Sequence, residues 1–361
     1  MWIICERKTD ARDNGYHFFR YLCRNHPEIN AAYIIDKNSC DYSRAAELGR
    51  IIQPNTFEHM LSFACAGVCI STHIMGYAPD TYRFALLDAK LGLVHTKKVF
   101  LQHGIIETDL KELYYPDSRL DLFVCTAIPE FNFVCGNFRH PDGVVQRLGL
   151  CRYDRLLTEH RVKKQILIMP TWRIYLRNLS KEEFIKSDYY KNYSELINCS
   201  QTADILKKYG YEMVLYLHYE LQPYAGLFKS GNPDIKIAEF KDYDVQNLLM
   251  DSAVLITDYS SILFDFAYMQ KPSAYFWFEE KAFFERHYKK GYFDCRADGF
   301  GPVFESLEPL LDYIRRCLEN NAQMPSEYKK RTEEFFDYGF KSKTTNCERT
   351  YDAISRIINK Q

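Results

Sequence analysis

The stretch that decides the fold is Val254-Leu255-Ile256-Thr257-Asp258-Tyr259-Ser260-Ser261-Ile262-Leu263-Phe264-Asp265. An apolar run leads into a short polar turn, so we expect a strand at Val254–Thr257 and a helix that begins near Ser260. A strand that passes directly into a helix is the repeating unit of parallel α/β sheets. The free N–H groups of the first helical turn, the helix dipole and two hydroxyls would suit an anion such as a diphosphate. The alternative is a simple helix cap, which needs only one Ser or Asp.

The same alternation of short apolar runs and amphipathic segments continues along the whole chain. Helices are expected behind polar caps at Tyr16–Cys23, after Asp13, and at Phe57–Cys65, after Thr56. The expected strands are Trp2–Cys5, Ala31–Ile35, Val68–Ser71, Lys98–Gln102, Asp121–Cys125 and Val144–Arg147 in the first half, and Gln165–Met169, Glu212–Leu217, Ile235–Ala238, Val254–Thr257 and Ser273–Phe276 in the second. Helical spacing without a strand signal is found at Leu307–Leu318, Pro325–Phe336 and Cys347–Ile358, which predicts a helical tail that packs across both halves.

This order of elements predicts an α/β protein with two doubly wound, Rossmann-type domains that face a cleft, followed by the helical tail. The charged stretch 152–164 lacks a strong apolar period and marks the boundary. We therefore expect domains at residues 1–150 and 151–340, and a helix at 341–361 that packs back toward the first domain. Ligands of such sheets bind at the C-terminal ends of the strands.

Composition narrows the class of protein. The chain has 361 residues, with 47 Lys and Arg against 48 Asp and Glu. This balance gives no net positive electrostatic field that would attract a nucleic acid. The 12 cysteines are scattered, and we expect reduced thiols rather than a disulfide framework. We expect no signal peptide, and the longest apolar stretch, residues 60–70, is shorter than the ~20 residues that span a bilayer. These features predict a cytoplasmic protein.

A histidine follows one of the strands expected in the first half. The segment Leu101-Gln102-His103-Gly104-Ile105 closes that strand, and Gly104 would permit a tight exit that leaves His103 exposed at the C-terminal edge of the sheet. A histidine there can act as a general base. The alternative is a structural histidine.

Two strands of the second half also end in polar residues. Met169-Pro170-Thr171-Trp172-Arg173 places a guanidinium where it could fork onto a phosphate, although an Arg in a surface ion pair is the alternative. His218 follows the strand Glu212–Leu217 and is expected to point into the cleft, unless it is a core histidine. Between the halves, Arg152 and Asp154 are expected at the hinge with Gly104, where the alternative is that they pair with each other.

Several signals argue against metals and cofactors. Asp242-Tyr243-Asp244 has the spacing of metal-dependent sugar transferases, but it precedes a helical run and is interpreted as a helix cap. Neither a Gly-x-Gly-x-x-Gly nor a Walker motif is found, which weighs against NAD and ATP. We expect neither a metal nor a cofactor. Residues 281–293 mix Phe, Tyr, Lys and Arg and could touch a membrane surface, with a solvated helix as the alternative.

Taken in order, these motifs resemble the CDP-glycerol glycerophosphotransferase family of teichoic-acid and capsule synthesis. The resemblance covers roughly residues 98–355 and is strongest at 256–272, whereas the first ninety residues match in general character only. The motifs that carry it are Leu101–Ile105, Gly149–Asp154, Pro170–Arg173, His218, Ile256–Asp265 with Lys271-Pro272, and Gly301-Pro302-Val303. The resemblance implies a GT-B architecture and transfer of a polyol phosphate from a CDP-polyol, with release of CMP and no metal.

The resemblance also implies roles for individual residues. His103 is similar to the histidine that takes the proton of the acceptor hydroxyl as it attacks the β-phosphate, and His218 to a second histidine at the donor phosphates. The residues expected to bind the donor are Thr171, Arg173, His218, Thr257, Asp258, Ser260, Ser261 and Asp265. Phosphoryl transfer needs mainly positioning and charge stabilisation, which such residues can supply. One departure is His218-Tyr219, where the family often has His-Pro.

The expected partners are a CDP-polyol donor and a glycan or polyprenyl-linked acceptor of the cell envelope. The expected location is the cytoplasm, with peripheral contact to the inner face of the cell membrane. A single-addition or capsule-type transferase is as compatible with the sequence as a polymerase. Two alternatives remain at this point: a GT-B glycosyltransferase that uses a UDP- or GDP-sugar, and a non-catalytic module that binds an anionic polymer.

Overall fold

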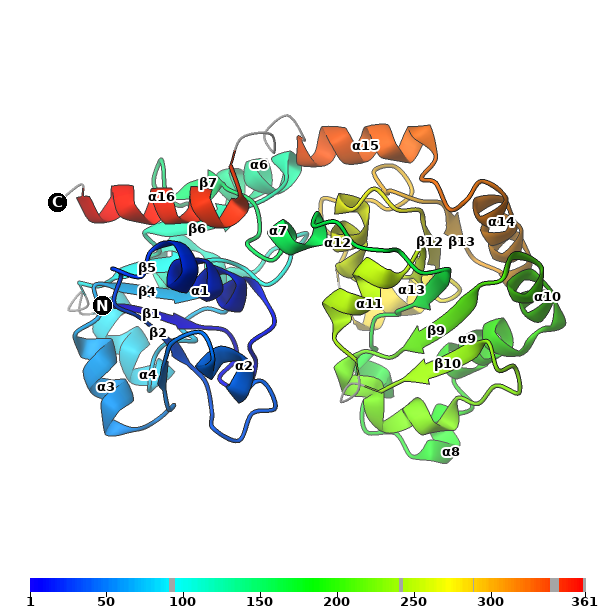
Figure 1. Cartoon of the computed structure of the whole chain (residues 1–361), viewed down its shortest axis with the longest axis horizontal. Coiled ribbons are helices and arrows are strands. Elements are labelled where there is room, and N and C mark those ends of the chain that lie inside the picture. Colours follow the sequence, from blue (N-terminus) through cyan, green and yellow to red (C-terminus); the bar gives the residue numbers. More distant parts are fainter. Residues whose placement is uncertain (91–94, 240–242, 288, 338–343, 360–361) are drawn as a thin grey trace. The chain divides into compact units, whose positions relative to one another are not determined.

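The computed structural model of the chain describes residues 1–90, 95–239, 243–287, 289–337 and 344–359. It divides into two compact units, drawn in Figure 1. Unit 1 comprises Met1–Arg155 and Phe335–Gln361, and unit 2 comprises Leu156–Glu334. Each unit is described by itself below.

The core of unit 1 is a parallel sheet. Within the described ranges it has seven strands in the order β3-β2-β1-β4-β5-β6-β7, and every adjacent pair is parallel. The strands are β1 (Trp2–Cys5), β2 (Ala31–Ile34), β3 (Arg50–Ile52), β4 (Val68–Ser71), β5 (Lys97–Phe100), β6 (Leu122–Cys125) and β7 (Val145–Arg147). The prediction missed β3, whose three residues include the exposed Arg50 and carry no apolar run. It also made β5 too long, because Leu101 and Gln102 belong to the turn that follows.

Helices cover both faces of this sheet. On one face, Ile4, Ile70 and Val99 pack with α1 and α16, and on the other, Ile3, Cys69 and Phe123 pack under α3, α4 and α6. The helical segments are α1 (Asn14–Asn25), α2 (Tyr42–Ala46), α3 (Phe57–Ala64), α4 (Thr81–Ala85), the π-helix η1 (Leu86–Lys90), the 3-10 helix η2 (Lys111–Leu113), α5 (Tyr115–Ser118), α6 (Ile128–Asn137), α7 (Tyr153–Leu156) and α16 (Asn346–Asn359).

The two expected caps of this unit turn out differently. Thr56 caps α3 as predicted, because its hydroxyl accepts a hydrogen bond from the His59 N–H at 3.2 Å. Asp13 precedes α1 but makes no side-chain cap bond. The buried Glu6 carboxylate takes this role by accepting the N–H groups of residues 12, 13 and 16 at 2.6–2.9 Å. A Cβ on Gly15 would lie 2.9 Å from Glu6 Cγ, so the helix can approach this carboxylate only with glycine there.

Unit 2 is built on a second parallel sheet. In the described residues it has six strands in the order β10-β9-β8-β11-β12-β13. They are β8 (Gln165–Ile168), β9 (Glu212–Tyr216), β10 (Ile235–Ala238), β11 (Val254–Thr257), β12 (Ser273–Phe276) and β13 (Val303–Phe304). The five predicted strands are confirmed to within one residue, and the two-residue β13 at the sheet edge was missed.

Two layers of helices cover this sheet as well. Ile166, Met213 and Val254 pack against α9, α10 and α14, while Leu167 and Leu255 face α11 and α12. Because α14 contacts β12 and β13, it is a layer of unit 2 and not part of a tail. The remaining elements of this half are η3 (Ile174–Leu176), α8 (Lys181–Phe184), α9 (Asp188–Asn198), α10 (Ser200–Tyr209), η4 (Tyr219–Leu227), α11 (Val245–Asp251), α12 (Ile262–Tyr268), α13 (Glu280–Arg286), α14 (Leu307–Glu319) and α15 (Ser326–Phe336).

One carboxylate holds the start of the C-terminal helix α16, which also packs into the core of unit 1 through Ala353 and Ile354. Asp154 accepts hydrogen bonds from the N–H groups of Asn346 at 2.7 Å and Cys347 at 2.9 Å, the first residues of the helix. Burial raises the pKa of Asp154, and the two N–H groups oppose this shift by stabilising its charged form. The Asp154 carboxylate is thus engaged by the start of α16, and Arg152 donates to another carboxylate, Asp13 Oδ1, at 2.7 Å.

Replacing Asp154 by Ala should loosen α16, because two N–H groups at its start lose their acceptor. A helix cap contributes about 1–2 kcal/mol, so amides of α16 should exchange with solvent about 5- to 30-fold faster. Hydrogen exchange followed by mass spectrometry measures this. The matched control is Asp352→Ala, which removes an exposed carboxylate from the same helix. Equal exchange rates in the two variants would contradict the anchoring role of Asp154.

Candidate functional site

The turn that carries His103 is held in an unusual backbone conformation. Gln102 has a φ of 61°, in the left-handed region that non-glycine residues rarely adopt. Its carbonyl accepts a hydrogen bond from Asn14 Nδ2 at 2.9 Å, and its Nε2 donates to Glu130 Oε1 at 3.1 Å. Gly104, expected to permit the tight exit, is not among the positive-φ residues of the described ranges. The strained residue is Gln102, and its fixed partners set the direction of His103.

Glu130 ties this turn to the end of β6. Its carboxylate is fully buried and also accepts the N–H groups of Ile106 at 2.9 Å and Thr126 at 2.6 Å. Burial raises its pKa, and the N–H donors around it act in the opposite direction. Sequence reasoning missed Glu130 because its partners lie more than twenty residues away in the turn after β5.

His103 itself is exposed and oriented by the end of β4. Its Nδ1 lies 3.4 Å from the carbonyl oxygen of Thr72, and its ring stacks on His73 with centroids 4.7 Å apart and planes inclined by 7°. A carbonyl oxygen can only accept, so the neutral His103 ring carries its hydrogen on Nδ1. The lone pair is then on Nε2, which is the arrangement that a general base requires.

A carboxylate and a guanidinium lie beside His103. Arg152 Nη1 donates to Asp13 Oδ1 at 2.7 Å and to the His103 carbonyl oxygen at 2.9 Å. Burial raises the pKa of Asp13, while Arg152 and His103 counteract this. Arg152, expected at a hinge, therefore lies beside the His103 turn.

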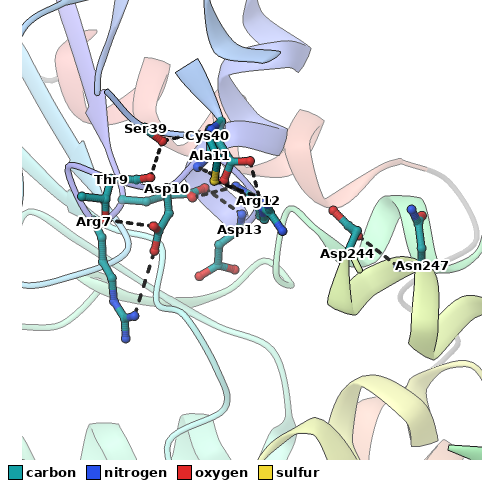
Figure 2. Close-up of polar contacts among 12 residues, drawn as sticks. Arg7, Thr9, Asp10, Ala11, Arg12, Asp13, Ser39, Cys40, Asp244 and Asn247 are labelled. Atoms are coloured by element: carbon teal, nitrogen blue, oxygen red, sulfur yellow. Dashed lines mark hydrogen bonds and ion pairs between the residues drawn. The ribbon is translucent and has the colours of Figure 1, made fainter. Parts of the chain in front are cut away.

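Asp13 is carried by the loop that follows β1, which Figure 2 shows in close-up. The loop is pinned to the start of α2 by Asp41, which accepts hydrogen bonds from Arg12 Nε at 2.7 Å and from the Ala11 N–H at 3.2 Å. Glu6 also holds this loop, because its carboxyl group accepts the N–H groups of Arg12 and Asp13. Burial and the neighbouring Asp13 raise the pKa of Glu6 to about 8. The loop is thus fixed by two carboxylates, Glu6 and Asp41.

In unit 2, Arg173 is fully buried instead of reaching for a ligand. Its Nη2 donates to Asp258 Oδ2 at 2.8 Å and its Nε to Glu279 Oε1 at 2.7 Å. Nη1 donates to the Thr171 carbonyl oxygen at 2.7 Å, and the rings of Tyr259 and Phe283 lie about the guanidinium. Burial alone would lower its pKa, but the two carboxylates hold the pKa well above its ordinary value. The expected fork of Arg173 onto a phosphate is replaced by this ion triad, the contacts of Arg173, Asp258 and Glu279.

The triad holds the polar turn after β11. Asp258 Oδ1 accepts the N–H groups of Thr171 at 2.7 Å and Tyr259 at 2.6 Å, which joins the ends of β8 and β11. Thr257 is turned inward and donates to the Met169 carbonyl oxygen at 2.7 Å. Asp258 and Thr257 therefore shape the turn from inside.

The two serines of this turn are accessible to solvent. Ser260 is partly exposed and Ser261 is exposed, and no side-chain cap bond of Ser261 occurs among the described residues. The simple-cap alternative for this serine is therefore not what the structure has. Asp265, one turn into α12, is buried. The Thr171 hydroxyl is buried without a hydrogen-bond partner in the described part of the chain.

Two histidines flank Trp172 at this end of the sheet. His218 stacks along the indole with centroids 6.0 Å apart, and His287 meets it edge-on at 4.7 Å. His218 Nδ1 accepts the Glu220 N–H at 3.2 Å, and His287 Nδ1 accepts the Ile174 N–H at 3.1 Å. Each neutral ring therefore carries its hydrogen on Nε2. Burial and the nearby Arg173 lower the pKa of His287 to about 4. His287 was missed, and the only signal for it was the aromatic segment 281–293.

Metal ligands do not gather in the described residues, where no three His, Cys, Asp or Glu side chains are placed to hold an ion. Asp244 accepts the Asn247 N–H at 3.0 Å at the start of α11, as Figure 2 shows, which confirms its interpretation as a cap. Asp242 lies outside the described residues. All twelve cysteines are described and are free thiols.

The fold places the chain among two-unit Rossmann-like proteins of the GT-B type. The wall teichoic acid polymerase TagF matches with a TM-score of 0.71 and 16% identity, over 100% of this chain and 90% of that one. The sequence profile of the family described as CDP-Glycerol:Poly(glycerophosphate) glycerophosphotransferase matches residues 1–355. The chain belongs to this family. The match confirms the resemblance and extends it over the first ninety residues.

Relatives of known name lie in teichoic-acid synthesis. The minor teichoic acid biosynthesis protein GgaB of Bacillus subtilis (strain 168) is 32% identical over 99% of this chain and 40% of its own length. The teichoic acid poly(glycerol phosphate) polymerase of the same strain is 27% identical over 55% of this chain and 25% of its own length. The chain thus spans less than half of the length of either relative.

Replacing Arg173 by Leu should lower the free energy of unfolding of unit 2 by about 3–5 kcal/mol, because two buried carboxylates lose their counter-ion. Urea unfolding followed by tryptophan fluorescence suits this test, since Trp172 adjoins Arg173 and Trp277 Nε1 donates to the Asp258 carbonyl oxygen. The control is Arg315→Leu, which breaks an exposed pair with Asp312 and should change stability by less than about 1 kcal/mol. Similar losses in both variants would refute the structural role of the triad.

Proposed function

We propose that this protein transfers a polyol phosphate, glycerol phosphate or ribitol phosphate, from a CDP-polyol to a hydroxyl of a cell-envelope glycan or polyprenyl-linked acceptor. The observation that carries the proposal is the different partner of Nδ1 in the two strand-end histidines. In His103 it is a carbonyl oxygen, which leaves the lone pair of the neutral ring on Nε2, and in His218 it is a backbone N–H, which leaves the ring hydrogen on Nε2. The first suits removal of a proton and the second suits donation to a phosphate oxygen. Membership of the glycerophosphotransferase family supports the same reaction.

In the proposed step, His103 Nε2 takes the proton of the acceptor hydroxyl while the hydroxyl oxygen bonds to the β-phosphorus of the donor. The bond from that phosphorus to the oxygen that bridges it to CMP breaks, and CMP leaves with the electron pair. The protonated ring has Asp13 close by to balance its charge. Such a base contributes about 10²- to 10⁴-fold to the rate.

On the donor side, we propose that the phosphates are bound by His218, Ser260 and Ser261, aided by the N–H groups at the start of α12. Thr171 and Asp265 complete the donor site in this proposal. Arg173, Thr257 and Asp258 serve it indirectly, because their polar groups are committed to the turns that carry these side chains. Hydrogen-bond donors that are already held in position stabilise the charge that develops on the phosphate oxygens, and the site need not rearrange to do so.

We further propose that the protein works at the cytoplasmic face of the cell membrane as a peripheral protein. No helix in the described part of the chain is long and apolar enough to cross a bilayer. Support for membrane contact comes from an exposed apolar surface on α3, α4 and η1, two of whose side chains, Phe57 and Tyr82, are 75% and 81% exposed. Helices α3 and α4 are in contact through Phe63 and Phe84, whose ring centroids lie 5.3 Å apart in an edge-on arrangement. The exposed apolar side chains of these elements are Phe57, Met60, Leu61, Tyr82, Leu86 and Leu87, and they form a second candidate for membrane contact besides residues 281–293.

The proposed reaction is tested by CMP release. Purified protein with CDP-glycerol or CDP-ribitol and envelope acceptors should release CMP, whereas His103→Ala should lower turnover about 10²- to 10⁴-fold and leave the affinity for CDP, measured by calorimetry, unchanged. Ser261→Ala should show the reverse, a weaker affinity for CDP. His95→Ala, at an exposed histidine of unit 1, is the matched control.

The proposal is wrong if no CMP appears while an active transferase releases it in the same assay. Release of UDP or GDP from sugar nucleotides would assign sugar transfer instead. Full turnover by His103→Ala would remove His103 from the mechanism.

Membrane contact is tested by co-sedimentation with vesicles of phosphatidylethanolamine and phosphatidylglycerol. Replacing Phe57 and Leu61 by Ser should weaken binding about ten-fold or more, because two large apolar side chains no longer enter the bilayer. Ile185→Ser removes an exposed apolar side chain from unit 2 and should leave binding unchanged. Unchanged binding of the double variant would exclude this surface.

A further inference from the structure

Two consecutive residues after the end of β4 contact the His103 ring. Thr72 supplies the carbonyl oxygen that accepts from His103 Nδ1, and His73 supplies a ring parallel to it, with centroids 4.7 Å apart. His73 is held in turn: its Nδ1 lies 2.9 Å from Thr72 Oγ1, and its N–H donates to Ser71 Oγ at 3.1 Å. The Thr72 side chain is fully buried, so this support has a fixed base.

We propose that His73 is a positioning residue for His103: its ring, stacked on His103, keeps Nδ1 of His103 on the Thr72 carbonyl and Nε2 directed to the acceptor hydroxyl. This inference rests on the proposed role of His103 as the base. His73 acts through His103 and does not itself take part in the transfer.

The charges around the pair allow only one ring to be protonated. Burial lowers the pKa of His73 to about 4, and electrostatic interactions with His103 and with Arg7 act in the same direction. Arg152 donates to the His103 carbonyl oxygen at 2.9 Å, and Asp13 interacts electrostatically with the His103 ring. His73 therefore stays neutral at working pH, and a neutral ring beneath a protonated one stabilises the charge through its π face.

The long Nδ1 to oxygen distance of 3.4 Å is the reason that the stack matters. A hydrogen bond of this length restrains a ring weakly. Without the flat surface of His73, rotation about the side-chain bonds of the exposed His103 would separate Nδ1 from the Thr72 carbonyl. The tautomer with the hydrogen on Nε2 would then become populated, and that form cannot act as a base at Nε2.

The test compares His73→Ala, His73→Phe and a matched control. His73→Ala should lower kcat about 10- to 100-fold at unchanged KM for CDP-glycerol, because the base is misplaced while the donor site is intact. His73→Phe keeps a flat ring and should restore most of the activity. The control, His26→Ala, removes another stacked histidine of unit 1, whose ring lies 3.6 Å from that of Tyr351, and should not change kcat. Equal losses in His73→Ala and His26→Ala, or no restoration by Phe, would overturn the proposal.

A second readout does not depend on activity. Long-range ¹H–¹⁵N spectra of the histidine rings, with His103 assigned from the signals lost in His103→Ala, should show hydrogen on Nδ1 of His103 in the wild type and a mixture of both tautomers in His73→Ala. His73 should stay neutral down to about pH 5, as its pKa near 4 requires. An unchanged His103 tautomer in His73→Ala would refute the inference. If the wild type released no CMP from either CDP-polyol, the proposed function would fail, but these spectra would still decide whether His73 positions His103.

Discussion

The burial of the Arg173 guanidinium between Asp258 and Glu279 is the constraint on which the polar turns of unit 2 depend. A buried guanidinium is tolerated only when its N–H groups have hydrogen-bond acceptors. Here two carboxylates and a backbone carbonyl oxygen accept from Arg173. The partners lie 85 and 106 residues further along the chain, so the triad forms only when β8, β11 and the segment before α13 have come together. Once formed, it fixes the turns that present Trp172 and the two serines.

Unit 1 follows the same principle with different residues. Glu130 and Glu6 are buried, and their carboxyl oxygens accept hydrogen bonds from backbone N–H groups. Each of them holds a turn at the C-terminal end of the sheet. The left-handed Gln102 is stable because both its carbonyl and its side chain have fixed partners. In both units, buried carboxyl, guanidinium and amide groups fix the backbone of the turns that carry the histidines.

Much of the fold could be predicted because a run of apolar residues indicates a buried strand without reference to the rest of the chain. The long runs in β1, β4, β9 and β11 gave correct strands, whereas β3 and β13 have three and two residues and too little apolar surface to be recognised. Of the candidate site, the positions of His103, His218 and the serine turn at strand ends could be predicted, since a strand end is a local feature. The role of Arg173 as a buried counter-ion could not, because nothing local distinguishes it from an arginine that binds phosphate.

The sequence by itself determined the two parallel α/β units, the polar residues at the ends of their strands and the family to which the chain belongs. Only the tertiary structure decided which of those residues are exposed, which nitrogen of each histidine carries the hydrogen, and that His73, Glu130, Glu279 and His287 belong beside them. The physical reason is that periodicity along a segment depends on that segment alone. The state of a charge or an imidazole depends instead on partners that distant strands bring within hydrogen-bonding distance.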